Sequence, residues 1–264
     1  MSLRVTRQGD GALPPLVLIH GWGFTASAWD GLLPQLESEF CLYRVILPGF
    51  DSDQSAAADH AALVNLDALA DQLVTAIPQP ALWLGWSLGG TLAAAVAARH
   101  PDNVTGLLTL ASNPCFVAQV DWPGMAPATF DAFYRGIGDD APKTLGRFLL
   151  LQGQGDSAAR AVVRGLKPAL ATTAAARGLL AGLDWLGEDH RGCFVGLSMP
   201  RRYLFGDGDA LVPAAVATMP LLAVHARVIT GAGHALLISG RTEVLAELRQ
   251  LSQQVTAVEP CRDR

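Results

Sequence analysis

Short apolar runs alternate along the chain with longer stretches in which apolar residues recur at helical spacing. The runs are rich in Leu, Val and Ile, which is typical of strands buried inside a parallel sheet. We expect such strands at residues 16–19, 43–47, 81–84, 104–111, 202–205 and 226–229. We expect helices at residues 29–40, 63–77, 91–98 and 242–255, and a surface loop at 51–59. This alternation predicts an α/β fold, with a doubly wound, mostly parallel sheet covered by helices on both faces.

The alternation stops between residues 114 and 197. This stretch is mostly helical in character, is interrupted at Trp122-Pro123-Gly124, and contains no convincing strand. An insertion that leaves the sheet and returns to it predicts a lid over the carboxyl ends of the strands, where open α/β folds bind their ligands. We therefore expect a core made of residues 1–113 and 198–264, and a helical lid made of residues 114–197.

Composition and charge narrow the class of protein. A chain of 264 residues that is half hydrophobic and 16% charged fits a compact enzyme with a large core. Its start lacks the apolar segment of a secretory signal, and no apolar run approaches the roughly 20 residues that cross a bilayer, so we expect a cytoplasmic protein. We also expect it to be a monomer. The net charge of −5 argues against general nucleic-acid binding. Scattered cysteines suggest neither a zinc site nor a disulfide framework, and we expect no metal or organic cofactor; they are Cys41, Cys115, Cys193 and Cys261.

The strongest chemical signal is Gly85-Trp86-Ser87-Leu88-Gly89, which follows an apolar strand and precedes a helix of small residues. A strand, a sharp turn and a helix form the nucleophile elbow of hydrolases, in which small neighbours permit a strained serine. Ser87 is therefore the candidate nucleophile. A chance Gly-x-Ser-x-Gly pattern in an ordinary turn is the alternative, and the flanking strand and helix argue against it.

A second glycine turn, His20-Gly21-Trp22-Gly23, follows the first apolar strand. A serine hydrolase needs backbone N–H groups that stabilise the oxyanion of the tetrahedral intermediate. We assign these donors to the N–H groups of Trp22 and Leu88. Without Ser87, a plain strand-ending turn would explain this segment equally well, and Trp22 would be a packing residue.

Two late turns supply a candidate base and acid. His234 lies in Gly231–Ala235 after one strand, and Asp207 and Asp209 lie in a glycine-rich turn after another. The order Ser, Asp, His is that of the α/β-hydrolase arrangement. We prefer Asp209, because the following Leu-Val-Pro would anchor its turn, whereas Asp207 fits a turn-stabilising role. The other histidines lie in less suitable contexts; they are His20, His60, His100, His190 and His225.

These motifs resemble the α/β-hydrolase superfamily over nearly the whole chain. Further segments resemble a narrower family, the pimeloyl-[acyl-carrier protein] methyl ester esterases of biotin synthesis; these segments are Leu47–Phe50, Trp83–Gly90, Ala111–Phe116, Asp121–Gly124 and Arg147–Gln152. That family is made of serine esterases that remove the methyl group from a pimeloyl chain carried on acyl carrier protein.

The resemblance implies roles for residues of this chain. Ser87, Asp209 and His234 would form the catalytic triad, and Trp22 and Leu88 would meet the substrate carbonyl. The acyl channel would be lined by Phe148, Leu149, Leu150, Leu151 and Gln152. The sequence departs from the family at Asp51, where a glycine is usual, and this departure concerns the shape of that loop and not the chemistry.

Charge gives an independent indication of a partner. Residues 143–167 carry +4, while the rest of the chain carries −9. The basic residues are Lys143, Arg147, Arg160, Arg164 and Lys167, and the one acid among them is Asp156. Like charges four residues apart on a helix repel each other mildly, unless an acidic partner meets them. Because acyl carrier proteins are acidic, this face is a candidate docking surface, with Lys143, Arg147, Arg160 and Arg164 as its contacts. A solvated helix face without function is the alternative.

Three readings of the function remain open from the sequence. The first is hydrolysis of an acyl methyl ester delivered by acyl carrier protein. The second is a general short-chain carboxylesterase or another hydrolase of the superfamily, such as one that cleaves C–C bonds. The third is a binding protein that has kept the fold without the chemistry, although an intact Ser, Asp and His argue against it.

Overall fold

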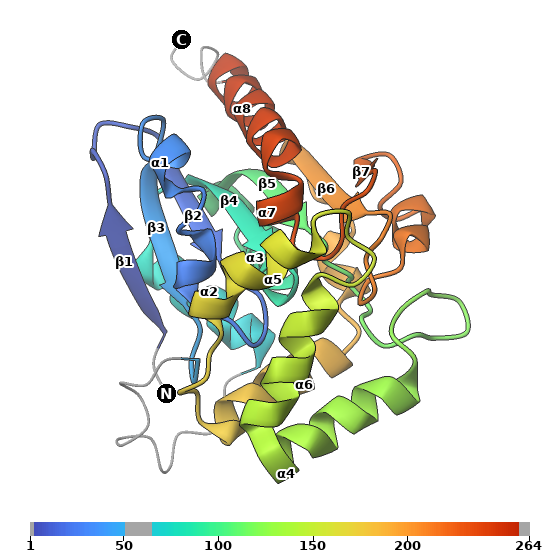
Figure 1. Cartoon of the computed structure of the whole chain (residues 1–264). Helices are drawn as coiled ribbons and strands as arrows, with labels where there is room; N and C mark the ends of the chain where they lie inside the picture. The colour runs from blue at the N-terminus through green and yellow to red at the C-terminus, as the bar shows by residue number, and fades with distance from the viewer. Residues whose placement is uncertain (1–2, 51–64, 259–264) are drawn as a thin grey trace.

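The computed structural model describes residues 3–50 and 65–258 of the chain. Its core is a seven-stranded sheet with the strand order β1-β3-β2-β4-β5-β6-β7 (Figure 1). Every neighbouring pair is parallel except β1 and β3, which are antiparallel. The strands are β1 (Arg4–Gln8), β2 (Pro15–Ile19), β3 (Cys41–Ile46), β4 (Ala81–Trp86), β5 (Val104–Leu110), β6 (Arg201–Gly206) and β7 (Ala226–Ile229).

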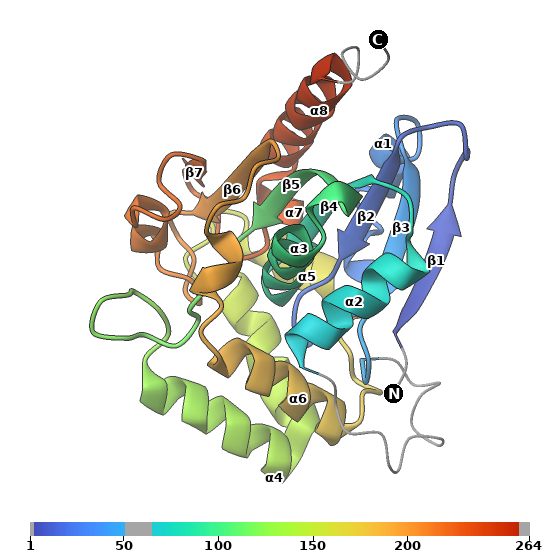
Figure 2. The same cartoon turned by 180° about the vertical axis from the view of Figure 1, so that it is seen from behind.

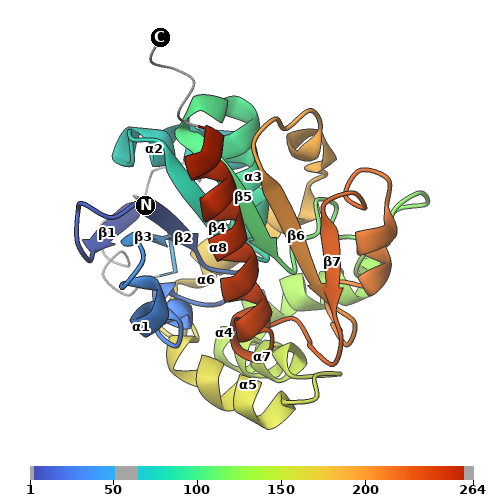
Figure 3. The ribbon, with the colours of Figure 1, turned by 90° about the horizontal axis from the view of Figure 1, so that it is seen from above.

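Helices cover both faces of this sheet and one of its ends. Viewed from above, α8 crosses one face, and α2 and α3 lie on the other (Figure 3). The helices are α1 (Leu33–Leu36), α2 (Leu66–Ala76), α3 (Leu88–Arg99), α4 (Pro127–Gln152), α5 (Ala159–Leu166), α6 (Ala176–Gly187), α7 (Leu236–Ser239) and α8 (Arg241–Val258). Short 3-10 helices are η1 (Ala26–Trp29), η3 (Pro101–Asn103), η4 (Lys167–Ala169), η5 (Arg191–Phe194) and η6 (Ala214–Thr218).

The doubly wound sheet is confirmed, and the structure differs from the expectations at two places. Helix was expected throughout residues 29–40, but η1 ends at Trp29 and only the single turn of α1 forms beyond it, because Gly31 and Pro34 interrupt a continuous helix. Strand β1 was not expected. It is mostly polar and joins the sheet edge through antiparallel pairing with β3, and its one apolar residue, Val5, is only partly buried against the core. The loop at 51–59, Asp51 and the first residues of the helix expected at 63–77 lie outside the described residues.

The centre of the sheet is packed tightly against α3. All six residues of β4 are buried, and α3 presents a continuous buried surface of small residues to it. Glycines make the approach possible: a Cβ on Gly85 would lie 2.3 Å from the carbonyl oxygen of Gly89, and one on Gly89 would lie 2.3 Å from that of Ile19. The close packing holds the start of α3 against the ends of β2 and β4, where the order of the strands reverses and open α/β sheets bind ligands.

The segment between β5 and β6 carries α4, α5 and α6, which gather at the carboxyl ends of the parallel strands (Figures 1 and 2). Helix α4 is kinked at Asp140, whose φ of −157° is not helical. Pro142 cannot donate a backbone hydrogen bond, and the Asp140 carboxylate caps the second half of the helix by accepting the N–H of Lys143 at 3.0 Å. The kink turns α4 back so that both halves reach the same end of the sheet. Among the described helices, none is long and apolar enough to span a bilayer.

Candidate active site

Ser87 occupies the sharp turn between β4 and α3. Its backbone has φ of 54° and ψ of −121°, a strained conformation for a residue with a side chain. The turn is held by the hydrogen bond from the N–H of Ser87 to the carbonyl of Leu110, at 2.8 Å. Gly21 lies against it, since a Cβ there would be 3.3 Å from Cβ of Ser87. The Ser87 side chain therefore projects from the end of the sheet at the first turn of a helix, with the residue 7% exposed.

Asp209 and His234 meet at the ends of β6 and β7. The Nδ1–H of His234 donates to Oδ2 of Asp209 at 2.8 Å, and both side chains are almost fully buried. The other carboxylate oxygen of Asp209 accepts the N–H groups of Leu211 and Val212 at 2.8 and 2.9 Å. The carboxylate is thus held from two sides, and its bond to Nδ1 leaves Nε2 of His234 as the nitrogen that can accept a proton.

Asp207 has a different role from Asp209. Its carboxylate accepts the N–H of Gly231 at 2.7 Å, and so ties the two turns that follow β6 and β7. This is a loop-stabilising contact, and the structure shows no bond from Asp207 to His234 within the described residues.

His234 and Ser87 line the same pocket, and Trp86 links their loops. The indole N–H of Trp86 donates to the carbonyl of His234 at 2.9 Å, and the two rings lie 5.9 Å apart, centroid to centroid. Because Trp86 precedes Ser87 directly, the base and the hydroxyl are attached to one rigid unit.

The two residues assigned to the oxyanion belong to segments that adjoin Ser87: Leu88 follows it in the chain, and Trp22 follows Gly21, which packs against it. Leu88 opens α3, so its N–H belongs to the first turn, where a helix leaves its donors free. Among the described residues, neither this N–H nor that of Trp22 has an acceptor. The Trp22 side chain is fixed separately, since its indole N–H donates to the carbonyl of Leu179 at 2.8 Å and its ring packs edge-on against Phe148. Both N–H groups are therefore free of protein acceptors in the described part of the chain.

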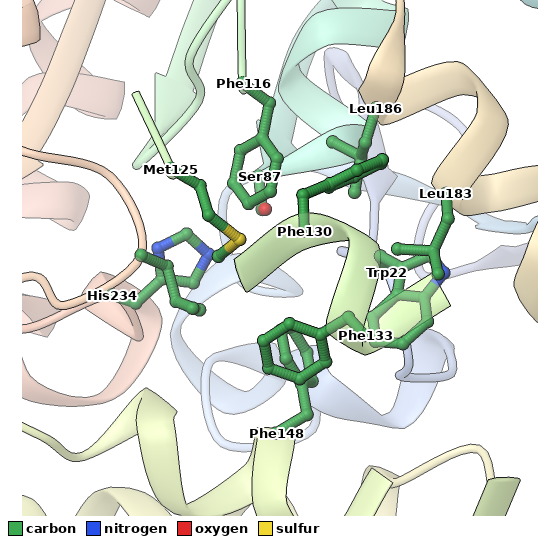
Figure 4. A pocket seen from close by; sticks show the side chains of 11 residues that line it. Trp22, Ser87, Phe116, Met125, Phe130, Phe133, Phe148, Leu183, Leu186 and His234 are labelled. Carbon is green, nitrogen blue, oxygen red and sulfur yellow. The ribbon is translucent and has the colours of Figure 1, made fainter. Parts of the chain in front are cut away.

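The pocket over Ser87 is walled almost entirely by apolar side chains, many of them from α4 and α6 (Figure 4). Its cavity volume is only about 10 Å³, close to the space of a single water molecule and far below the roughly 300–1,000 Å³ usual for ligand pockets. Its lining residues are Trp22, Ser87, Phe116, Met125, Phe130, Phe133, Phe148, Leu183, Leu186, Leu211 and His234. Apart from the serine hydroxyl and the imidazole, no lining side chain offers a hydrogen-bonding group to a carboxylate or an ammonium group.

The five residues expected to line the acyl channel separate into different environments. Phe148 lines the pocket. The expectation for Leu150 is wrong: it is 63% exposed and borders a surface hollow together with residues of α5, because successive residues of a helix face different directions. Leu149 and Leu151 pack into the core, and Gln152 is fully buried, but none of these three is among the residues that line the pocket.

Sequence reasoning missed most of the pocket wall. Phe130 and Phe133 are three residues apart, which places both on one face of α4, and this spacing was a usable signal. Leu183 and Leu186 show the same spacing on α6. No local pattern pointed to Met125. It reaches the pocket through the folding of the loop after β5.

His20, in the turn that carries Trp22, is a structural histidine. Its Nδ1–H donates to the carbonyl of Gly21 at 2.9 Å, and its Nε2 accepts the N–H of Leu47 at 3.2 Å, so the neutral ring is fully used. Burial lowers the pKa of His20 from 6.5 to about 4, and the bond to Gly21 opposes this only in part. The neutral ring joins the turn after β2 to the segment after β3.

This histidine makes stability depend on pH. Above pH 6.5 the ring is neutral in the folded and the unfolded chain; between pH 6.5 and about 4 only the unfolded chain takes up the proton. Folding stability is therefore expected to fall by about 3 kcal/mol through this window as the pH is lowered. The variant His20→Gln should be less stable at pH 7, by about 1–3 kcal/mol, but should lose less between pH 6.5 and 4. Urea unfolding at pH 7 and pH 4.5 measures this, and equal losses in the two proteins would refute it.

The part of the chain that the structure describes contains neither a metal-binding cluster nor a disulfide bond. No group of three or more His, Cys, Asp or Glu side chains gathers there to hold a metal ion. Cys41, Cys115 and Cys193 are free thiols, and burial raises the pKa of the last two. Cys261 lies outside the described residues.

Comparisons with known proteins agree with this geometry. The family model of the alpha/beta hydrolase fold matches residues 14–240. The pimeloyl-[acyl-carrier protein] methyl ester esterase of Klebsiella pneumoniae (strain 342) is 42% identical over 210 residues, covering 78% of this chain and 79% of that protein. Its counterpart from Aeromonas salmonicida (strain A449) is 39% identical over 253 residues, covering 90% and 94%.

Solved structures with low sequence identity share the fold. A bromoperoxidase from Bacillus anthracis superimposes with a TM-score of 0.82 at 20% identity, covering 95% of each chain. An esterase from Exiguobacterium antarcticum superimposes with a TM-score of 0.78 at 19% identity, covering 96% of this chain and 95% of that one. On the fold, the matched family model and these two relatives, the chain belongs to the α/β-hydrolase family and, within it, to the family of the pimeloyl-[acyl-carrier protein] methyl ester esterases.

Proposed function

We propose that this protein is a serine carboxylesterase that hydrolyses the methyl ester of a pimeloyl chain carried on acyl carrier protein, as the names of its relatives say of them. The observation that carries the chemistry is the buried hydrogen bond between Asp209 and His234, together with the apolar pocket that His234 shares with the strained Ser87. Together these residues supply a nucleophile, a base and the group that orients the base.

The reaction follows from the positions of these groups. Nε2 of His234 takes the proton of Ser87 as Oγ attacks the ester carbonyl carbon, and Asp209 stabilises the positive charge that forms on the imidazole ring. The N–H groups of Trp22 and Leu88 donate to the oxyanion of the tetrahedral intermediate. His234 then protonates the departing methoxide, which leaves as methanol. Water, activated by the same imidazole, attacks the acyl-enzyme and releases the free acid.

The pocket explains why an ester, rather than a free acid, is the substrate. Its aromatic and aliphatic wall favours an acyl chain, and burial of an apolar chain is worth about 0.8 kcal/mol per methylene. None of the described residues that line the pocket is a lysine or an arginine, so the carboxylate product has no cationic partner among them, and desolvation opposes its return. A neutral methyl ester is therefore bound and its charged product is released.

We propose that the segment 114–197 acts as the lid of this pocket. Phe130, Phe133 and Phe148 on α4, with Leu183 and Leu186 on α6, form the roof over Ser87 and His234 (Figure 4). Admission of an acyl chain requires these side chains to separate, because the cavity of about 10 Å³ is nearly filled by them.

A basic face on the lid supports the carrier as partner. Lys143, Arg147 and Leu150 share one exposed side of α4, since they are spaced four and three residues apart. Arg160 and Arg164 on α5 border the surface hollow in which Leu150 is exposed, and none of these cations has an ion-pair partner among the described residues. We call Lys143, Arg147, Leu150, Arg160 and Arg164 the docking patch. It offers an acidic partner unpaired charges around an apolar contact.

A comparison of two substrates tests this proposal. Wild-type protein should turn over the pimeloyl-carrier methyl ester with a higher kcat/KM than free methyl butyrate. The triple change Arg147→Glu, Arg160→Glu and Arg164→Glu should lower kcat/KM for the carrier-bound ester by about 100-fold, because three attractions become repulsions, and should leave the free ester within about twofold.

The control has the same net charge outside the docking patch: Arg135→Glu, Arg177→Glu and Arg249→Glu, three exposed arginines. It should keep most of its activity on both substrates. Equal losses in the two triple variants, or an equal loss on both substrates in the first, would count against docking at this face. Equal kcat/KM for both substrates in the wild type would favour a general short-chain esterase. The monomeric state and the cytoplasmic location stay predictions.

A further inference from the structure

The connection between α4 and α5, residues 153–158, contacts the turns that carry both Asp209 and His234. Asp156 is its central residue, and it is only 7% exposed. Its Oδ2 accepts the N–H of Gly233 at 2.6 Å, and Gly233 immediately precedes His234 in the chain. Its Oδ1 accepts the N–H of Ala158 at 2.7 Å, which fixes the carboxylate on its own segment. The carboxylate therefore bridges the lid segment and the turn that carries the base.

Two neighbouring contacts repeat this bridge. The N–H of Ser157 donates to the carbonyl of Gly231 at 2.9 Å, on the same turn as His234. Gly155 packs directly on Gly208, one residue before Asp209: a Cβ on either glycine would lie 2.1 Å from the carbonyl oxygen of the other. Gly155 has φ of 79°, which only glycine adopts without strain. The connection thus touches the acid turn and the base turn side by side.

We infer that Asp156 is a positioning residue, whose carboxylate holds the backbone of Gly233 and thereby sets the position of the His234 imidazole relative to Ser87. The inference rests on the proposed function, because it concerns the base of that reaction. The physical reason is that a hydrogen bond to an ionised acceptor is short and strong, and here it acts one residue from the base. The imidazole of His234 is bonded to Asp209 at Nδ1, and the backbone carbonyl of His234 accepts the indole N–H of Trp86. The bond from the Gly233 N–H to Asp156 adds a third contact that holds this turn.

The position of Asp156 also joins the base to the docking patch. Arg160 and Arg164 lie on the helix that begins immediately after this connection. A change in the connection should therefore move the catalytic turns rather than the surface alone, since displacements of about 1 Å at a reacting group cost up to 100-fold in rate.

The test compares Asp156→Asn with a matched buried carboxylate. An asparagine at 156 keeps one acceptor oxygen and places an amide N–H₂ against the second N–H, so the bond to Gly233 or that to Ala158 is lost. We expect kcat for p-nitrophenyl butyrate to fall about tenfold with KM within about twofold, and the rate of labelling of Ser87 by a fluorophosphonate to fall equally. The control is Glu247→Gln, which alters a buried carboxylate on α8. This carboxylate forms an ion pair with Arg227 at 2.6 Å. It should lower the Tm and leave kcat unchanged.

A second variant covers the case in which Asp156→Asn does not fold. Gly233→Ala keeps the carboxylate but adds a Cβ 3.1 Å from Oδ2 of Asp156, which pushes the two segments apart by a few tenths of an ångström. It should lower kcat severalfold without raising KM. Full kcat in Asp156→Asn, or in Gly233→Ala, overturns the inference, as does a loss that Glu247→Gln shows equally. Ser87→Ala separates the two proposals: if it stays active, the proposed function fails, and if it is inactive while Asp156→Asn has full kcat, only this inference fails.

Discussion

The variant Ser87→Ala is expected to lose about 10⁵-fold or more in kcat on both the carrier-bound ester and p-nitrophenyl butyrate. The loss is large because no acyl-enzyme can form without Oγ, and the base and oxyanion donors alone give only weak catalysis. Measurement of initial rates at saturating substrate gives the effect. Labelling with a fluorophosphonate, followed by mass spectrometry, should find the label on Ser87 in the wild type and nowhere in the variant.

Ser157→Ala is the matched control for this substitution. Ser157 is exposed, lies near the same turns, and contacts Gly231 through its backbone N–H, which alanine keeps. Its rates should stay within about twofold of the wild type, as for most surface substitutions. Substantial hydrolysis by Ser87→Ala would remove Ser87 from the mechanism and with it the esterase proposal.

The variant Asp209→Asn is expected to lower kcat by about 10⁴-fold, with little change in KM. The surrounding backbone fixes the orientation of the new amide group. The N–H groups of Leu211 and Val212 need an acceptor, so the amide oxygen of the asparagine must take the Oδ1 position. Its N–H₂ group then faces Nδ1 of His234, which must become an acceptor and leave its proton on Nε2. An imidazole in this tautomer cannot take the proton of Ser87.

Asp207→Asn is the control, because an asparagine oxygen can still accept the N–H of Gly231. Its kcat/KM should stay within about twofold of the wild type. The two variants carry the same chemical change two residues apart. A comparison of their pre-steady-state and steady-state rates therefore measures directly which aspartate the reaction needs. Equal losses, or a larger loss in Asp207→Asn, would reverse the assignment of the acid.

The sequence by itself determined the turns that carry the proposed catalytic residues, because those turns depend on local structure. A buried strand, two glycines and a helix of small residues force the turn at Ser87, and the same reasoning placed glycine turns at His234 and at the two aspartates after later strands. Parallel strands bring their carboxyl ends together, so the order of these turns predicted where they would lie. The preference for Asp209 also came from local packing, since Leu211 and Val212 are buried beside it.

Only the tertiary structure decided the walls of the pocket and the contacts of the lid. Helix geometry separates Phe148 from Leu150, but which of the two lines the pocket depends on how the second half of α4 packs after the kink at Asp140. In the sequence, Asp156 stands out only as the single acidic residue in the basic stretch 143–167. Its bond to Gly233 joins residues 77 apart in the chain, and no local pattern encodes such a contact. Spacing along a chain determines turns and helix faces, whereas long-range contacts exist only once the lid has packed on the sheet.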